Sequence, residues 1–378
     1  MNADKMQGDG SSERQGDVLL VAMEMGLKSW RLALALAGSL RHRQKSMEAG
    51  QYGQFDAAVA EARERFGLAA DCRVSVCYEA GRDGFYPYRQ LVSAGYTVWL
   101  IDSSSIEVDR RYRRAKNDVL DAGRLLGLMQ RRWRGELPMR LVRVPTPEQE
   151  DERQRSRERE ELRQDRQRLK VRMQSLLFAQ GLREFPRSVA AIERWLERRE
   201  LPRHLAVRVR RELERLRLVD RQLKTVEGER RQAQANAPDA TSMDGTAARL
   251  YRLRGIGECG ASVLSAEMFG WRRFRNRREV GAVAGLVPTP YDSGESQREQ
   301  GISKAGNKRL RRTIIEIAWK WLDYQPDSVL SQWFKQRFGQ QGKRSKRLGI
   351  VALARRLLVE LWHYLEHGVL PRGALLKA

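Results

Sequence analysis

Four carboxylates in the first third of the chain have the settings expected of a site for divalent cations. Glu24 and Glu79 each close an apolar run with strand character, within DVLLVAMEMG and RVSVCYEAG. Asp118 and Asp121 lie three residues apart in the helical pattern AKNDVLDAGRLLGLM, which puts both on one face. Carboxylate oxygens that converge from two strands and a helix can hold two hard cations. The pattern therefore predicts metal-assisted chemistry on phosphodiesters.

The segments that carry these acids predict an α/β domain. Two apolar runs flank the polar corner at residues 26–29, so Glu24 would close the first strand of a hairpin. An unpaired carboxylate at a strand end is costly unless it meets a metal or another partner, which favours a site role for Glu24 and Glu79. Asp118 and Asp121 alone would also fit an ordinary helix face, because most of the 48 Asp and Glu residues must be surface charges.

A serine in a basic segment offers a second kind of chemistry. In GLVPTPYDSGESQREQ, two prolines and Gly294 predict that Ser293 lies in a non-helical loop. Basic residues that we expect to contact nucleic acid follow it: Lys304, Lys308, Arg309, Arg311 and Arg312. A hydroxyl in such a setting can attack a phosphodiester and store the bond energy in a phosphoserine link. A serine that only shapes the turn fits the same spacing, and Ser296 and Ser303 lie in the same segment.

The overall charge favours a phosphate-rich partner. The 378 residues include 72 Lys and Arg against 48 Asp and Glu, a formal net charge of +24, as in nucleic-acid-binding proteins. No apolar run is long enough to span a bilayer and no amphipathic anchor is evident, so we expect no membrane partner. Residues 1–16 lack the apolar core of a signal peptide, which predicts a disordered tail and a cytoplasmic protein. The three cysteines and four histidines have no zinc spacing, so we expect reduced, buried cysteines.

Shifts in composition predict three folded parts. An α/β domain would span residues 17–145, a helical segment rich in Arg, Glu and Gln residues 148–233, and a mostly α-helical domain residues 246–370. Within the middle segment, two sets of apolar residues repeat at heptad spacing: Leu162, Leu169 and Leu176, and Val209, Leu216 and Leu223. Pro186 and Pro202 interrupt the segment, which predicts two long helices joined through a shorter element. An antiparallel pair, an intermolecular coiled coil and a solvated helical spacer all fit.

Two features of the third part favour contact with a nucleic-acid backbone. Gly255 and Gly257 form a Gly-Ile-Gly turn between two helical runs, which resembles a helix-hairpin-helix element that cradles a phosphate on backbone N–H groups. A helix end with tight packing would use the same glycines. Downstream, WRRFRNRREV carries arginines interleaved with aromatic residues, and we select Arg272, Arg273 and Arg275 as contacts. The aromatic residues there also fit a hydrophobic core.

In their order and spacing these motifs resemble the IS110 family of insertion-sequence transposases. The resemblance covers residues 19–365 and rests on CYEAG, AKNDVLDA, LRGIGECGASVLSAE, the arginine-rich run through PYDSGESQ, and GISKAGNKRLRR. It implies a RuvC-like, RNase H-like domain with a DEDD site for Mg²⁺ at Glu24, Glu79, Asp118 and Asp121, then a coiled coil, then a transposase domain with Ser293 as nucleophile. Glu24 departs from the usual aspartate, and its extra methylene moves the carboxylate outward by about one bond length, to which octahedral Mg²⁺ is sensitive.

The resemblance also implies partners and an assembly. A member of the family would act as a DNA recombinase that excises and inserts its own mobile element, with a structured noncoding RNA that pairs with donor and target DNA. A chain whose arginines mostly contact phosphates would gain specificity from such a guide. The serine domain would reach the acidic domain only by folding over the helical segment or by pairing between subunits. We therefore expect a homo-oligomer, either a dimer or a tetramer.

Two other interpretations of the sequence are open. A structure-selective nuclease resembling a Holliday-junction resolvase would hydrolyse DNA with the four acids alone, without a protein–DNA adduct. A non-catalytic basic protein would bind DNA or RNA through the Gly-Ile-Gly turn and the arginines, without metal, and its binding would weaken with salt. The formation of a covalent adduct distinguishes the recombinase from both.

Overall fold

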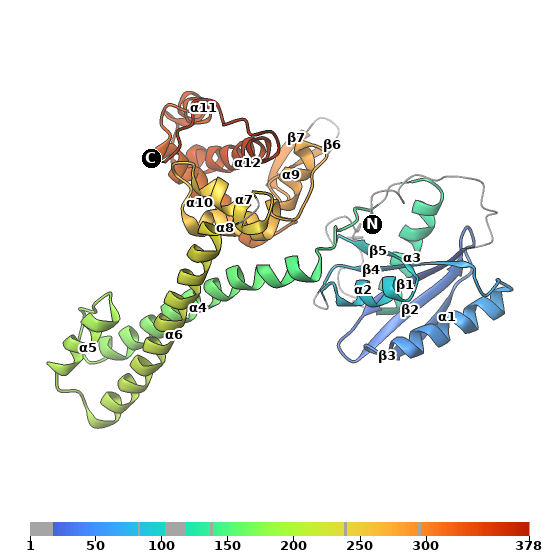
Figure 1. The fold of residues 1–378 in the computed structure, drawn as a ribbon, viewed down its shortest axis with the longest axis horizontal. Helices are drawn as coiled ribbons and strands as arrows, with labels where there is room; N and C mark the ends of the chain where they lie inside the picture. Colours follow the sequence, from blue (N-terminus) through green and yellow to red (C-terminus); the bar gives the residue numbers. More distant parts are fainter. Residues whose placement is uncertain are drawn as a thin grey trace. The chain divides into compact units, whose positions relative to one another are not determined.

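A computed structural model describes residues 18–81, 84–102, 118–136, 139–237, 240–293 and 296–377 (Figure 1). For residues 118–120, 290–293 and 296–300 it describes the backbone alone. The chain forms two compact units, Met1–Val144 (unit 1) and Pro145–Ala378 (unit 2). The predicted tail, residues 1–16, lies outside the described residues.

Unit 1 is built on a five-stranded mixed sheet with the strand order β3-β2-β1-β4-β5. The strands are β1 (Val18–Met25), β2 (Ser29–Leu36), β3 (Arg43–Glu48), β4 (Arg73–Glu79) and β5 (Thr97–Ile101). The first three form an antiparallel meander, whereas β4 and β5 run parallel to β1. The hairpin predicted around residues 26–29 is confirmed, because Met25 pairs with Trp30 and the Gly26 N–H donates to the Ser29 carbonyl at 3.0 Å. The α/β character of the N-terminal domain is thus confirmed.

Helices cover both faces of this sheet. Alternate residues of a strand point to opposite faces, so each buried strand contributes to two cores. Leu19, Val21 and Met23 of β1 belong to a core shared with α1 (Tyr52–Phe66) and α2 (Tyr86–Ser93). The intervening residues of β1 belong to a second core, together with Ala122, Leu125 and Met129 of α3 (Asp118–Trp133). The two acids predicted at strand ends therefore lie in a sheet that is buried on both faces.

Unit 2 begins with two long helices, α4 (Pro147–Phe178) and α6 (Arg203–Ala235), with α5 (Val189–Glu197) between them. Thr146 forms a capping box with Gln149, which fixes the start of α4. Ion pairs join Arg159 to Glu227, Arg166 to Asp220 and Arg172 to Glu212, at 2.7, 3.1 and 3.1 Å. Since the first member of each pair rises in number while the second falls, α4 and α6 are antiparallel neighbours within one chain (Figure 1). A coiled coil between chains stays a prediction.

The rest of unit 2 is a mostly helical body around one large core. Its elements are α7 (Met243–Tyr251), α8 (Glu258–Leu264), the π-helix η4 (Ser265–Phe269), α9 (Arg277–Val283), β6 (Pro288–Ser293), β7 (Ser296–Ile302), α10 (Lys308–Tyr324), α11 (Val329–Phe338) and α12 (Lys343–His367). Trp321 is fully buried in this core, and its indole N–H donates to the Ser328 hydroxyl at 2.9 Å. Trp271 is also buried, in a small cluster with Met243, and Phe274 packs against the large core. Both aromatic residues of the arginine-rich run are therefore core residues.

A C-terminal strap, residues 371–377, is tied to the start of this body. Leu376 bridges to Leu253, and the Arg254 N–H donates to the Leu375 carbonyl at 3.1 Å. The Gln325 side chain also donates to the Leu375 carbonyl, at 2.8 Å, and accepts from the Leu375 N–H at 2.8 Å. The strap thus links the segment after α7 to the end of α10.

Two smaller predictions also find an outcome in the fold. All three cysteines are free thiols; Cys77 is buried, which raises its pKa, whereas Cys72 and Cys259 are only partly buried. Across the part of the chain that the structure describes, no helix combines the length and apolar character needed to cross a bilayer.

Candidate functional site

Glu24 and Glu79 lie side by side at the carboxyl ends of two parallel strands. The register of β1 and β4 pairs Met23 with Tyr78, so the two glutamates are the next residues along neighbouring strands. Such strands lie about 4.8 Å apart. Along each strand, Glu24 is two residues after Ala22 and Glu79 is two residues after Cys77, so each lies on the same face of the sheet as its counterpart. Ala22 and Cys77 both face α3. The backbone therefore places both acids at one edge of the sheet, on the α3 face.

The start of α3 is directed at this same edge. Near its C-terminal end, the Gln130 amide donates to the carbonyl of Leu36, which pairs with Leu19 at the start of β1. Midway along α3, the Cys77 thiol contacts the Leu125 carbonyl at 3.9 Å. Helix α3 therefore runs antiparallel to β1 and β4, and its first turn, which begins at Asp118, points toward the carboxyl ends of these strands. The backbone brings the positions of all four predicted acids to one region.

The side chains are not gathered as tightly as the backbone. Asp121 accepts a hydrogen bond from the Arg124 guanidinium at 3.1 Å, and Glu79 is exposed to solvent. The side chain of Asp118 lies outside the described residues. Among the described side chains, no group of three or more His, Cys, Asp or Glu is arranged to hold a metal ion. Oxygen ligands of this kind suit Mg²⁺ in type, so the donor set fits, but a cation at Asp121 would have to displace Arg124.

Ser293 lies at the tip of a β-hairpin rather than in an open loop. It ends β6 and pairs in register with Ser296, the first residue of β7. The prolines that favoured a loop are accommodated because both strands of a two-stranded hairpin are edge strands, where a missing N–H is tolerated; the register is irregular between Pro288 and Pro290. Ser303 lies at the base, where its N–H donates to the Val287 carbonyl at 2.8 Å. Two of the three candidate serines therefore share the hairpin tip.

Of the basic residues that follow the hairpin, the arginines have partners within the protein. Arg311 donates to the carbonyls of Ala284 and Lys304 at 3.1 and 3.0 Å, and Arg312 pairs with Glu160 of α4 at 2.6 Å. Lys304 and Lys308 are exposed. The two lysines are therefore the better placed of these residues for a phosphate backbone, whereas the arginines also hold the body together.

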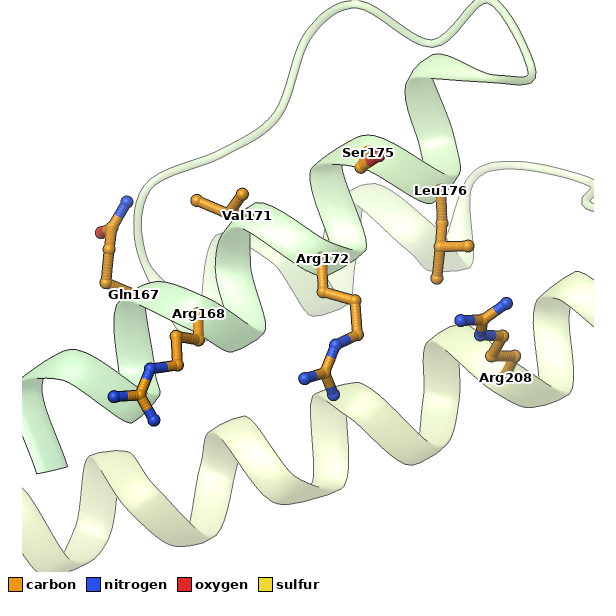
Figure 2. Close-up of a pocket in the computed structure, with 7 residues that line it drawn as sticks. All are labelled: Gln167, Arg168, Val171, Arg172, Ser175, Leu176 and Arg208. Carbon is orange, nitrogen blue, oxygen red and sulfur yellow. The ribbon is translucent and has the colours of Figure 1, made fainter. Parts of the chain in front are cut away.

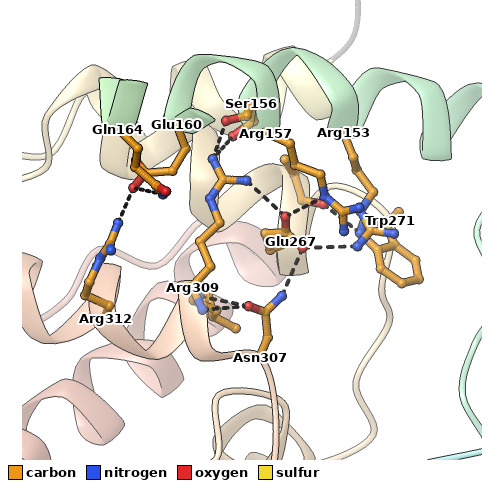
Figure 3. A network of polar contacts seen from close by, with 12 residues as sticks. Arg153, Ser156, Arg157, Glu160, Gln164, Glu267, Trp271, Asn307, Arg309 and Arg312 are labelled. Carbon is orange, nitrogen blue, oxygen red and sulfur yellow. Dashed lines mark hydrogen bonds and ion pairs between the residues drawn. The ribbon is translucent and has the colours of Figure 1, made fainter. Parts of the chain in front are cut away.

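Arg309 belongs to a buried ionic network that the sequence did not predict (Figure 3). The centre is Glu267 of η4, which is only 2% exposed. Its carboxylate accepts from Arg153 and Arg157 of α4, at 3.0 and 3.3 Å, and from Asn307 and Arg309 at the start of α10, at 2.9 and 3.1 Å. Burial alone would raise the pKa of Glu267, but Arg153 and Arg157 outweigh it and lower the pKa to about 2. Glu267 is therefore a fixed negative charge that holds α4 against the body.

Comparison with known proteins gives the family. A sequence model described as the transposase IS116/IS110/IS902 family matches residues 247–331. A putative transposase, y4rJ, from Sinorhizobium fredii is 41% identical over 377 residues, which cover 95% of this chain and 94% of the relative. The chain belongs to this transposase family. A transposase for insertion sequence element IS1328 from Yersinia enterocolitica is 31% identical over 52% of this chain and 58% of the relative. A probable family 20 transposase from Pseudomonas aeruginosa is 40% identical over 18% of this chain and 21% of the relative.

The matched segment of the transposase contains the Gly-Ile-Gly turn, which lies between α7 and α8 as predicted. Gly255 has a φ of +86°, and a Cβ there would lie 3.2 Å from the Lys320 carbonyl oxygen of α10. Gly257 precedes α8 as its N-cap, with nothing within 4 Å of a Cβ. The Ile256 carbonyl accepts from the Lys377 ammonium at 2.7 Å. Close packing therefore accounts for Gly255, whereas Gly257 is open to a ligand.

The arginine-rich run of the transposase divides into packed and exposed residues. The Arg272 guanidinium stacks on the Trp271 ring, 4.2 Å from its centroid. Arg273 is 65% exposed and lies 3.9 Å from Glu366, and Arg275 is exposed. Of the three arginines selected from the sequence, Arg273 and Arg275 are therefore the more accessible to a nucleic acid.

A groove of about 450 Å³ lies on the helix pair, away from the candidate serines (Figure 2). It is lined by Gln167, Arg168, Val171, Arg172, Ser175, Leu176 and Arg208. Arg168 and Arg172 are bound to Asp165 and Glu212, at 2.9 and 3.1 Å. None of the described residues that line the groove is a carboxylate, so they offer no charged oxygen ligand for a hard cation.

Proposed function

We propose that this transposase excises and inserts an insertion sequence of the IS110 type, with Mg²⁺ bound by acids of unit 1 and Ser293 as the nucleophile. One observation carries the unit 1 part of the proposal. Glu24 and Glu79 lie near the carboxyl ends of neighbouring parallel strands, at the edge toward which the first turn of α3 points. Backbone positions of acids that converge in this way from two strands and a helix support a RuvC-like assignment for unit 1.

In this proposal the four acids supply oxygen ligands, and bound Mg²⁺ would stabilise the negative charge that develops on the phosphate. Asp121 would exchange its contact with Arg124 for the cation. The freed guanidinium would then be available to a DNA phosphate. Glu24, one methylene longer than the usual aspartate, would reach the cation from its strand with a different side-chain rotamer.

Ser293 would act at the tip of the β6–β7 hairpin. Its Oγ forms a bond to phosphorus while the bond from phosphorus to a deoxyribose oxygen breaks. The hydroxyl proton leaves to a base, and the departing deoxyribose oxygen takes up a proton. The phosphoserine ester conserves the energy of the broken bond, so rejoining to a new strand needs no external energy source.

The proposed partners are donor DNA, target DNA and a structured noncoding RNA, with a homo-oligomer, a dimer or a tetramer, as the active form. The net charge of +24 supports polyanionic partners. Exposed Lys304, Lys308, Arg273 and Arg275 are the residues that we propose for contacts to phosphates, and the exposed Gly257 is a further candidate in the same matched segment.

The test is to trap protein–DNA adducts. The protein is incubated with Mg²⁺, the RNA from its element and labelled donor and target DNA, in wild type and in Ser293→Ala, Asp121→Ala and Ser296→Ala. We expect an adduct that Ser293→Ala and Asp121→Ala abolish and Ser296→Ala keeps. If Ser293→Ala still cleaves DNA and no adduct forms, the protein is instead a nuclease that depends on metal alone. If the adduct is lost only in Ser296→Ala, the nucleophile is Ser296 and not Ser293.

A further inference from the structure

The β6–β7 hairpin is anchored at its base by a dense set of backbone contacts. The N–H groups of Ser303, Lys304 and Asn307 donate to the carbonyls of Val287, Gly285 and Val283, at 2.8, 3.2 and 2.8 Å. Gly285 and Gly306 cross so closely that a Cβ at Gly285 would lie 2.5 Å from the Ala305 carbonyl oxygen, and one at Gly306 would lie 2.7 Å from that of Val283. A pivot of the hairpin would therefore break these contacts unless the segment between β7 and α10 moved with it.

That segment is held in turn by Glu267. Asn307 is the N-cap of α10, because its side-chain oxygen accepts from the N–H groups of Arg309 and Leu310 at 3.0 and 3.1 Å. The amide nitrogen of the same side chain donates to Glu267 at 2.9 Å. One side chain thus ties the end of the hairpin base to the buried carboxylate.

The other ligands of Glu267 come from α4 and α10. Arg153 is 8% exposed and its guanidinium lies 5.1 Å from the Trp271 ring centroid, so this side chain is packed away from solvent. Arg309 donates from α10 to Glu267 and also to the carbonyl and hydroxyl oxygens of Ser156 in α4. Figure 3 shows the guanidinium groups of Arg153, Arg157 and Arg309 directed at the carboxylate. The carboxylate is where α4, η4 and the start of α10 meet, and π-helical turns such as η4 frequently occur at functional sites.

We infer that Glu267 is a positioning residue for the hairpin that carries Ser293, an inference that rests on the nucleophilic role proposed for that serine. The six residues of β6 span about 20 Å at 3.3 Å per residue. A rotation of about three degrees at the base therefore moves the tip by about 1 Å, and a misplacement of about 1 Å can cost a reaction about 100-fold. Loss of the charge at Glu267 should slow the chemical step, because the contacts that hold the base of the hairpin in place against α4 become weaker.

The experiment compares Glu267→Gln with a matched control, Glu212→Gln. Glu212 of α6 is likewise a buried glutamate, 4% exposed, and accepts from Arg172 and Arg215 at 3.1 and 2.9 Å, but its partners belong to the helix pair. Both variants of the full chain are studied by hydrogen–deuterium exchange without DNA, and by the rate of adduct formation at saturating DNA.

We expect the amides of Ser303, Lys304 and Asn307 to exchange at least about tenfold faster in Glu267→Gln, and at their wild-type rate in Glu212→Gln. Adduct formation should fall by about 30- to 100-fold in Glu267→Gln alone, while the DNA concentration for half-maximal rate stays within about twofold of wild type. Exchange at the hairpin base that is unchanged, or equally accelerated in both variants, would overturn the inference. So would a loss confined to DNA affinity.

A second variant guards against failure to fold. Asn307→Ser keeps a hydroxyl to cap α10 but removes the amide donor to Glu267, and the arginine contacts remain. It should change exchange and rate in the same direction, by about three- to tenfold; wild-type exchange at the base would count against the coupling. The nucleophilic role of Ser293 is tested separately. An adduct that survives Ser293→Ala would exclude that role, while hydrogen–deuterium exchange would still show whether Glu267 holds the hairpin.

Discussion

Two substitutions in the Gly-Ile-Gly turn, Gly255→Ser and Gly257→Ser, compare a tightly packed glycine with one whose Cβ position is open. A residue with a Cβ at the φ of +86° found at Gly255 costs about 1–2 kcal/mol. The contact at 3.2 Å with the Lys320 carbonyl oxygen adds about 1–2 kcal/mol, because α10 cannot retreat from the buried Trp321 beside it. Together these predict a loss of about 2–4 kcal/mol in the free energy of unfolding.

Gly257→Ser introduces the same side chain two residues later, with the opposite expectation. Gly257 has an extended backbone, an open Cβ position and no side-chain cap for α8. Serine at an N-cap is at least as favourable as glycine, so stability should stay within about 0.5 kcal/mol of wild type. Urea unfolding of the full chain, followed by tryptophan fluorescence, measures both variants. Equal losses, or a larger loss for Gly257→Ser, would refute the packing geometry assigned to Gly255.

Three further predictions concern other parts of the transposase. The pKa of Glu267, about 2, lies below the value of 4.5 in an unfolded chain. The ionised carboxylate therefore contributes about 3 kcal/mol to the free energy of unfolding above about pH 5, and this contribution is lost as the pH falls toward 2. Between pH 5 and 3 the free energy of unfolding should depend less steeply on pH in Glu267→Gln than in wild type, and an equal slope would exclude this role for Glu267. Leu216 is fully buried and Leu218 is 48% exposed on the same helix, so Leu216→Ala should cost about 2–4 kcal/mol and Leu218→Ala less than about 0.5 kcal/mol in thermal unfolding; a large loss for Leu218→Ala that depends on protein concentration would indicate an interface between chains. If Glu24 holds Mg²⁺, Glu24→Gln should weaken Mg²⁺ binding in calorimetry at least about tenfold while Glu24→Asp stays within about threefold of wild type, whereas unchanged binding in both variants would remove Glu24 from the site.

The sequence predicted those features that depend on local pattern. Two apolar runs and the polar corner at residues 26–29 predict β1, β2 and their hairpin, and the acids that close apolar runs predict which edge of the sheet carries Glu24 and Glu79. Proline positions likewise predict the break between the two long helices. These signals lie within a few residues of the structure that they specify, so a single sequence contains them in full.

Features that depend on distant contacts could not be predicted in this way. Arg153 and Glu267 are 114 residues apart, and nothing in either local sequence marks the pair. The basic segment after Ser293 predicts that Arg309 contacts nucleic acid, because an arginine there has the same pattern whether its partner is a phosphate or a buried carboxylate. The prolines beside Ser293 predict a loop where the structure has a hairpin, because proline signals loops more strongly than edge strands. Only the fold decides between such alternatives.

The C-terminal strap bears on the order in which the transposase is assembled as it is made. The segment after α7 is bonded to residues 375–377, with Lys377 on the Ile256 carbonyl, yet more than a hundred residues are synthesised between the two. While the ribosome is still making α10–α12, the Gly-Ile-Gly turn has emerged but lacks the residues that close it. The body can therefore complete its fold only after residues 375–377 have left the exit tunnel, long after the Gly-Ile-Gly turn has emerged.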